Sequence, residues 1–398
     1  MRLLVLVHGY PPAVGGVEFA VRDLAERLVA RHGFDVTVLT TNAFTNENFR
    51  DRRLPTVPIR ADEVQNGVRV RRFAVDTRWA PPLRVAQGVA WRLRLPGNDR
   101  LRTLYQGPIA PALRRAAAAT PADAVFAASF PLNHLNYAFR PDRLPVVLLG
   151  AVHPEDAWGY HRPNLLALSR RAAATVALTP GERRWLVDHG APEERTHCIP
   201  EGIDPATATL GAFRAERGLG PGDFVIAYVG QQGSHKGIDV LIRALPRLPD
   251  ARLVIAGSVT PYSAEIRRLA RGDERVILLD GVDERLKASI MADCDVFASP
   301  SAYESFGITT LEAWAQSKPV VLGDGPAQRE LTDGGRLGVL VPYGQVEPLA
   351  GALQELAASP ARRRELGEAG RRRLLERYTL DAVVDRYHEL FVQLAASR

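Results

Sequence analysis

Short runs of apolar residues alternate along the chain with segments in which apolar residues recur every three or four positions. Residues 3–7 form the first run, and residues 17–30 place Val17, Ala20, Val21, Leu24, Ala25 and Leu28 on one helical face. A loop containing proline and glycine separates the two. Alternation of this kind predicts βαβ units and parallel sheets.

The same pattern occurs twice, on either side of a segment rich in Gly, Ala and Pro. Residues 204–223 form this segment, and we interpret them as an interdomain linker. The first half predicts strands at residues 3–7, 36–40, 68–73, 124–128, 146–152 and 175–178. The second half predicts strands at residues 224–229, 252–256, 275–279, 296–299, 319–322 and 338–341, a helix at residues 238–245 and a last helix at residues 380–395. The chain is therefore predicted to be an α/β protein with two doubly wound domains and a cleft between them, where ligands of such sheets bind.

Composition narrows the class of protein. The chain has 398 residues, 46% of them hydrophobic and 24% charged, which fits two soluble domains and excludes both a single small module and wholesale disorder. No apolar stretch approaches the ~20 residues of a membrane-spanning helix, and the apolar N-terminus ends at His8 without a cleavage site. Cys198 and Cys294 lie far apart, which favours the cytoplasm and argues against a disulfide framework or a zinc site.

The positive charge lies in the first half of the chain. Residues 1–200 hold 27 Arg, no Lys and 18 acidic residues, a net charge of +9, while the rest of the chain has a net charge of −3. This asymmetry fits an anionic partner such as a lipid surface, a phosphorylated acceptor or nucleic acid. The codon bias of a GC-rich genome explains it equally well.

Part of this charge accompanies tryptophan in one segment. Residues 78–102 interleave Trp79, Leu83, Val85, Val89, Trp91, Leu93 and Leu95 with six arginines. Such a segment is typical of a helix in a membrane interface, and it also fits an ordinary helix with an arginine-rich solvent face.

Residues 299–315 carry the most specific pattern. A strand ends in Ser-Pro-Ser, a short loop carries Glu304, a helix begins near Gly307, and Glu312 follows inside that helix. The unpaired amides of a helix start bind phosphate, and glycine lets a ligand approach the backbone closely. Carboxylates on either side can accept hydrogen bonds from sugar or ribose hydroxyls.

The combination of Pro-Ser, Glu-x-Phe-Gly and two glutamates eight residues apart resembles the retaining, GT-B-fold glycosyltransferases of the family 4 type. Three further segments in the same order support the resemblance: Tyr10-Pro11-Pro12-Ala13-Val14-Gly15-Gly16-Val17-Glu18, Ile199-Pro200-Glu201-Gly202-Ile203-Asp204, and Tyr228-Val229-Gly230 with Lys236-Gly237. The resemblance implies an acceptor domain at residues 1–204, a donor domain at residues 205–379, and a C-terminal helix, within residues 380–398, that packs back on the acceptor domain.

The resemblance also assigns expected roles. The catalytic residues would be His153, Glu304 and Lys236, and the donor-binding residues would be Gly15, Gly16, Gln231, Lys236, Phe306, Gly307, Ile308, Thr309 and Glu312. The family normally has an Arg where this chain has Gln231, so one positive charge near the donor diphosphate is missing unless His235 or an arginine elsewhere supplies it. Catalysis in the family needs no metal, and no cofactor is expected.

The expected activity is transfer of a sugar, with retention, from a nucleoside-diphosphate sugar to a hydroxyl acceptor such as a lipid or cell-envelope glycan, with no nucleic-acid partner. The alternative is a sugar-nucleotide epimerase of the same architecture, which would need no acceptor. A nicotinamide dehydrogenase fits less well because neither glycine loop reads GxGxxG. A non-enzymatic module bound through the basic half would require retention on nucleic acid, for which the chain has no recognisable motif. Base, sugar, acceptor and oligomeric state stay open.

Overall fold

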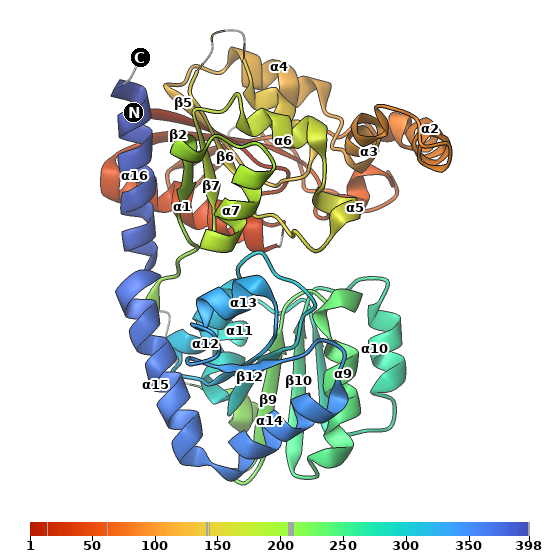
Figure 1. Cartoon of the computed structure of the whole chain (residues 1–398), viewed down its shortest axis with the longest axis vertical. Helices are drawn as coiled ribbons and strands as arrows, with labels where there is room; N and C mark the ends of the chain where they lie inside the picture. Colours follow the sequence, from red (N-terminus) through yellow and green to blue (C-terminus); the bar gives the residue numbers. More distant parts are fainter. Residues whose placement is uncertain (14, 62, 141, 143, 206–210, 397–398) are drawn as a thin grey trace. The chain divides into compact units, whose positions relative to one another are not determined.

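In a computed structural model, two α/β units account for the chain. The structure describes residues 1–396 except 14, 62, 141, 143 and 206–210. Contacts within the chain divide it into unit 1, Met1–Pro200 with Val383–Arg398, and unit 2, Glu201–Ala382. Each unit has a parallel sheet with helices packed against it (Figure 1). The predicted pair of doubly wound domains is thus confirmed.

Unit 1 contains eight strands in the order β3-β4-β2-β1-β5-β6-β7-β8, parallel except for β3. Its strands are β1 (Arg2–Leu6), β2 (Asp35–Thr41), β3 (Glu63–Gln65), β4 (Val68–Phe73), β5 (Ala124–Ala127), β6 (Val146–Leu149), β7 (Ala174–Ala177) and β8 (Thr196–Cys198). Its helices are α1 (Gly16–His32), α2 (Ala80–Arg92), α3 (Asn98–Gln106), α4 (Pro111–Ala119), α5 (Ala157–Tyr160), α6 (Pro163–Ser169) and α7 (Pro180–Asp188). The two edge strands β3 and β8 add to the predicted set, and β6 ends three residues before the predicted boundary.

Unit 2 contains six parallel strands in the order β11-β10-β9-β12-β13-β14. Its strands are β9 (Phe224–Val229), β10 (Ala251–Gly257), β11 (Val276–Asp280), β12 (Val296–Ser299), β13 (Val320–Gly323) and β14 (Val339–Val341). Its helices are α8 (Phe213–Glu216), α9 (Ile238–Ala244), α10 (Ser263–Leu269), α11 (Glu284–Asp293), α12 (Ile308–Ala315), α13 (Pro326–Leu331), α14 (Val346–Ala358) and α15 (Pro360–Arg377). Side chains of β9, β10, α9 and α14 supply much of its buried core.

Helix α16 (Leu380–Ala396) packs on unit 1, as the fold class predicted (Figure 1). Tyr387 and Phe391 meet the ring of Phe126 edge-on, with centroids 5.6 and 6.0 Å away. The ring of His388 stacks on His32 at 3.9 Å, and Asp385 accepts hydrogen bonds from His32 and Arg31. Burial of one apolar face therefore fixes this helix.

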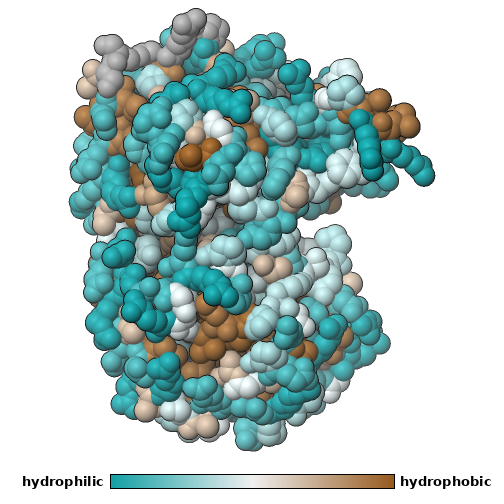
Figure 2. All heavy atoms as spheres, in the orientation of Figure 1, coloured by the Kyte–Doolittle hydropathy of each residue, from teal (hydrophilic) through white to brown (hydrophobic). Residues whose placement is uncertain are grey.

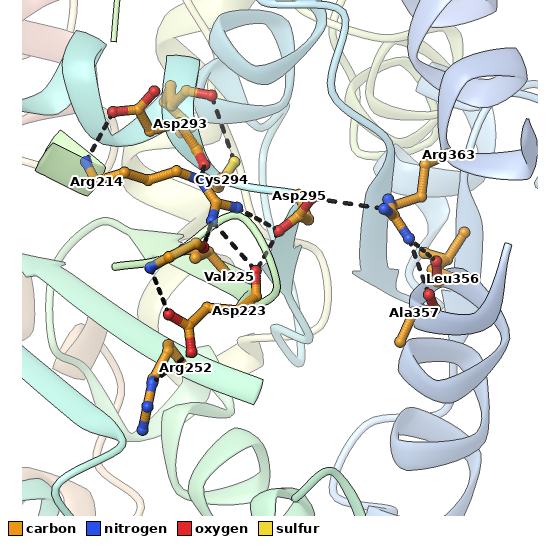
Figure 3. A network of polar contacts seen from close by, with 12 residues as sticks. Arg214, Asp223, Val225, Arg252, Asp293, Cys294, Asp295, Leu356, Ala357 and Arg363 are labelled. Atoms are coloured by element: carbon orange, nitrogen blue, oxygen red, sulfur yellow. Dashed lines mark hydrogen bonds and ion pairs between the residues drawn. The ribbon is translucent and has the colours of Figure 1, made fainter. Parts of the chain in front are cut away.

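The predicted linker is not all linker. Residues 206–210 lie outside the described part, but the segment after them forms α8 and joins a polar network at the amino ends of β9 and β12 (Figure 3). Asp295 accepts hydrogen bonds from Arg214 at 2.5 Å and from the Val225 amide at 2.8 Å, and it lies 3.6 Å from Arg363. The Asp293 carboxylate accepts from the Arg214 amide at 2.9 Å. The two aspartates thus bind arginines at the edge opposite the carboxyl ends of the strands.

Candidate functional site

The loop after β12 presents a carboxylate at the carboxyl edge of the unit 2 sheet. Glu304 lies on this loop, and its Oε1 accepts hydrogen bonds from the Ser301 hydroxyl at 2.9 Å and from Lys236 Nζ at 2.6 Å. Both charged side chains are largely buried, with exposed fractions of 16% for Lys236 and 18% for Glu304. The ion pair is thus oriented by a hydroxyl and shielded from solvent.

Lys236 comes from a different loop, the one that follows β9. The strand order reverses between β9 and β12, and the loops at such a point form the ligand crevice of an open sheet. Gly237 has φ +70°, and a Cβ there would lie 2.4 Å from the carbonyl oxygen of Pro300. The His235 carbonyl accepts from the Ala302 amide at 2.8 Å. Glycine is therefore needed for the two loops to touch and for Lys236 to reach Glu304.

Helix α12 begins directly after this loop. Gly307, with φ +100°, precedes its first residue and no side chain caps the helix. The amides of Ile308 and Thr309, in the first turn, lack an acceptor four residues earlier within the helix, and the helix dipole adds partial positive charge. Phe306 is buried and its ring lies edge-on to Tyr378 at 5.7 Å, so its side chain anchors the loop. The helix start is therefore suited to hold an anion.

Glu312 lies further along α12 and pairs with a second lysine. Its Oε1 accepts from Lys287 Nζ at 2.6 Å, and Lys287 also contacts Glu284 at 2.9 Å. Burial lowers the pKa of Lys287, but its contacts with the two glutamates outweigh this and raise the pKa above its ordinary value. Glu312 is thus held in an ion pair with Lys287.

Gln231 stands where the family pattern has an arginine, and its neutral side chain does not supply the missing positive charge. Its side chain is exposed, and its backbone carbonyl accepts a hydrogen bond from the Tyr228 hydroxyl at 2.7 Å. Burial, and then the charge of Glu304, raise the pKa of Tyr228 well above its ordinary value. The ring of His235 stacks on Tyr303 at 4.8 Å and 2°. His235 is thus placed on the same loop as Lys236, where a protonated imidazole would add positive charge.

The predicted glycine pair of unit 1 divides into two cases. Gly15 precedes α1, and a Cβ there would lie 2.3 Å from a carboxylate oxygen of Glu18, whereas a Cβ at Gly16 would meet open space. Val14, between these glycines and Tyr10, lies outside the described residues. Glu18 is buried and lies 3.0 Å from His8 Nε2, while His8 Nδ1 contacts the Ser129 hydroxyl at 2.6 Å. His8, Glu18 and Ser129 thus form a chain of three polar side chains where the strand order reverses between β1 and β5.

His153 follows β6, as predicted, and its ring meets that of Tyr160 edge-on at 4.9 Å. Just before it, the Val152 amide donates to Glu182 at 3.1 Å, and Ala151 has φ +48°. The histidine therefore lies on a tightly held turn at the carboxyl edge of the unit 1 sheet.

The structure brings Lys236, Glu304 and the start of α12 together within unit 2. It places Glu312 on the same helix but pairs it with Lys287, a residue absent from the sequence prediction. Ser301, Tyr228 and the His8–Glu18–Ser129 chain were also missed. Glu18, Tyr228 and Ser301 lie inside the motif segments quoted above, but nothing in those motifs assigns them a contact, and His8 and Ser129 have no sequence signal beyond a position next to a predicted strand end.

Two family models match the chain in succession. "Glycosyl transferase 4-like domain" matches residues 15–202 and "Glycosyl transferases group 1" matches residues 211–373. Within the described residues no helix is both long and apolar enough to cross a membrane.

Similar proteins agree with these matches. The alpha-maltose-1-phosphate synthase of Mycolicibacterium smegmatis is 31% identical over 51% of this chain and 58% of its own length. The GDP-mannose-dependent alpha-(1-6)-phosphatidylinositol monomannoside mannosyltransferase of the same organism is 26% identical over 94% of both chains. Among solved structures, sucrose-phosphate synthase from Thermosynechococcus elongatus superposes with a TM-score of 0.77 at 21% identity, covering 100% of both chains. The chain spans about half the length of several of the curated relatives that it matches, between 50% and 58%.

Proposed function

The chain belongs to the group 1 glycosyltransferases of the GT-B fold, and from this premise we propose that it transfers a sugar from a nucleoside-diphosphate sugar to a hydroxyl acceptor. One observation carries the proposal: Lys236 and Glu304 meet at 2.6 Å, in the loops on either side of the strand-order reversal, just before α12 begins. A cation, a carboxylate and the amides of a helix start lie side by side here, and together they suit a donor with a charged diphosphate and neutral sugar hydroxyls.

Each group has a role in donor binding. Lys236 and the amides of Ile308 and Thr309 would hold the diphosphate, since the leaving group departs with added negative charge. Glu304, with the amides of Phe306 and Gly307, would hold the sugar hydroxyls. Glu312 would accept from the ribose hydroxyls, in place of part of its contact with Lys287.

The proposed reaction proceeds with retention at the front face of the sugar. The acceptor oxygen forms the new bond to the anomeric carbon, the bond from that carbon to the diphosphate oxygen breaks, and a phosphate oxygen takes the acceptor proton. His153 would position the sugar or acceptor and, through its carbonyl, favour the positively charged transition state. Gly15 and Gly16 would let the ligands lie against the backbone. The amides of α12 and Lys236 would supply the electrostatic stabilisation, so we expect no metal requirement.

The test is incubation of the purified protein with nucleoside-diphosphate sugars, with and without acceptor extracts. The expected result is a nucleoside diphosphate and a product with the donor's anomeric configuration, formed only with acceptor. Isomerisation of the donor in the absence of any acceptor would instead establish the epimerase.

Replacing Glu312 by alanine should chiefly weaken donor binding. A hydrogen bond to a charged group is worth about 1.5–3 kcal/mol, so the Kd of the nucleoside diphosphate should rise roughly 10- to 100-fold, with a smaller change in kcat. Lys287 keeps Glu284 as a partner at 2.9 Å, which protects the fold. Calorimetric titration measures the Kd, and Glu265→Ala, at a surface pair with Arg268, is the matched control. An unchanged Kd in Glu312→Ala would refute the ribose role.

The acceptor class is proposed to include lipids and cell-envelope glycans, reached from a membrane surface. Figure 2 shows a hydrophobic patch over α2, the helix that projects with α3 from the rest of unit 1 in Figure 1. The large exposed apolar side chains of α2 and of the residues that flank it are Trp79, Val85, Val89, Trp91, Leu93 and Leu95. Only Ala80 and Ala90 of α2 are buried, so the helix presents most of its apolar side chains to solvent. Apolar and arginine side chains exposed together favour an anionic lipid surface.

Replacing Arg92 and Arg94 by glutamine should weaken binding to anionic vesicles by about tenfold or more, because each arginine near such a surface adds attraction. Sedimentation with vesicles of phosphatidylglycerol and phosphatidylcholine measures the effect. Arg271→Gln/Arg285→Gln, which removes two exposed charges from unit 2, is the control. Identical sedimentation of the parent and the variant that lacks Arg92 and Arg94 would contradict the membrane proposal.

A further inference from the structure

Two arginine side chains of unit 1 are buried and lie close enough for their positive charges to repel each other. Arg102, on α3, is 5% exposed, and Arg162, just before α6, is 0% exposed. Burial, and then the neighbouring charge of Arg102, lower the pKa of Arg162 to about 10. Two like charges removed from water need compensation.

Their hydrogen bonds leave several donors over. Arg102 Nη2 donates to the His161 carbonyl and Arg162 Nη1 donates to the Thr103 hydroxyl, both at 3.2 Å. Arg102 Nε, Arg162 Nε and Arg162 Nη2 are buried and have no hydrogen-bond partner. Such atoms are rare in folded proteins and each needs an explanation.

No carboxylate of the described chain forms an ion pair with either arginine. Asp99 and Asp156 are near enough to act on both charges. Their oxygens, however, accept from backbone amides, Asp99 from Asn164 at 3.0 Å and Asp156 from Gly159 at 2.9 Å. The two aspartates therefore balance the charge at a distance without occupying the unused N–H groups.

Trp158 covers the pair. Its ring centroid lies 5.4 Å from the Arg102 guanidinium and 5.7 Å from that of Arg162, and the side chain is 44% exposed. The Arg102 guanidinium also lies 5.6 Å from the ring centroid of Trp91. A surface pocket includes that ring, and it is lined by Gly88, Trp91, Arg92, Arg94, Leu95 and Asn98. Ring faces attract guanidiniums more weakly than desolvation penalises them, so the rings do not complete the compensation.

We propose that Arg102 and Arg162 form a binding site for a phosphate group carried by the acceptor, with Trp158 as its cover. This rests on the proposed transferase function and names a substrate class for it. A single arginine can bind a phosphate through two parallel N–H···O hydrogen bonds. The two positive charges of Arg102 and Arg162 match the two negative charges of a phosphomonoester dianion. Trp158 must turn aside for the phosphate to reach the unused donors.

The cover also connects this site to the expected reaction centre. Trp158 belongs to the single-turn helix α5, which also carries Tyr160, and the Tyr160 ring meets His153 at 4.9 Å. A phosphate that displaces Trp158 would therefore act on the segment that holds His153.

The experiment titrates inorganic phosphate into the full chain and into Arg162→Met, by calorimetry and by tryptophan fluorescence. We expect binding in the parent, a Trp emission change that Trp158→Phe removes, and at least about tenfold weaker binding in Arg162→Met. Arg162→Met should also unfold at a higher temperature, because it removes a buried charge with unused donors. Arg100→Met, at an exposed arginine of the same helix as Arg102, is the control and should bind phosphate as the parent does.

Two sources of phosphate are separated by a second arm with vesicles that contain phosphatidylinositol 4-phosphate, whose headgroup carries a phosphomonoester. Binding of inorganic phosphate that depends on Arg162 supports a soluble phosphorylated acceptor, and vesicle binding alone that depends on Arg162 supports a lipid headgroup. Equal affinity in parent and Arg162→Met, or no binding of either probe, overturns the site. Binding of nucleoside diphosphates to the parent is measured separately. If the parent binds phosphate through Arg162 but binds no nucleotide, the phosphate site is supported and the donor proposal is refuted. If the parent binds a nucleotide but no phosphate, only the phosphate site is refuted.

Discussion

Alanine in place of Glu304 is expected to lower kcat for sugar transfer by about 100-fold or more, with a much smaller change in the Kd of the nucleoside diphosphate. The carboxylate lies beside Lys236 and the start of α12, where the reacting sugar of a donor held by those groups would lie. Hydrogen bonds to the sugar hydroxyls that strengthen as the bond to the diphosphate breaks stabilise the transition state, so their loss lowers kcat. Steady-state kinetics and calorimetric titration separate the two effects.

Glu265→Ala again provides the control, because its loss removes only a surface pair and should leave kcat unchanged. Lys236→Ala and the double variant complete a cycle. Since Lys236 and Glu304 contact each other, we expect their effects on kcat to be non-additive. Parent kinetics in Glu304→Ala would remove this residue from the reaction centre.

The second large effect concerns the fold of unit 2. Asp295→Ala removes the acceptor for Arg214 Nη2 and for the Val225 amide, and it leaves both of these N–H groups without that partner at the base of the sheet, while Arg214 Nε and Nη1 keep their backbone carbonyl acceptors (Figure 3). Breaking a partly buried pair of this kind costs about 2–3 kcal/mol. For a unit of this size the unfolding midpoint should fall by roughly 5–10 °C.

Differential scanning calorimetry of the full chain measures that midpoint, with Glu265→Ala as the variant expected to match the parent. The Kd for a nucleoside diphosphate, measured well below the midpoint, should stay the same because Asp295 lies at the opposite edge of the sheet from the Lys236 loop. A midpoint equal to that of the parent would show that Arg214 and Val225 find other partners.

The apolar pattern was sufficient to predict both sheets, because buried parallel strands are continuous apolar runs. The strand at residues 224–229 was predicted with its observed bounds. The three-residue edge strands β3 and β8 were missed since they bury little and lack such a run. The composition of the segment that contains α8 is typical of a linker. The segment is held in place by hydrogen bonds from Arg214 to Asp293 and Asp295, some eighty positions away, which composition does not indicate.

The candidate site was predictable where its signal is local. The Glu-x-Phe-Gly loop and the Lys236-Gly237 pair were predictable because each is a short contiguous pattern that resembles the family's. Lys287, Ser301 and the Arg102–Arg162 pair depend on contacts between separate elements, and nothing in the spacing of those residues indicates them. The large apolar side chains of α2 were compatible with either a buried or an exposed face, and only their exposure in the structure distinguishes the two.

The most direct test of the central claim is a thermal-shift screen of the purified chain against UDP, GDP, dTDP, ADP and NAD, repeated with Glu312→Ala. At ~100 times its Kd, a bound nucleotide stabilises by about 2.7 kcal/mol, enough to raise the unfolding midpoint measurably. The proposed function predicts a shift with one nucleoside diphosphate that is lost or reduced in the variant. A shift with NAD alone, or no shift with any of the five, would contradict it.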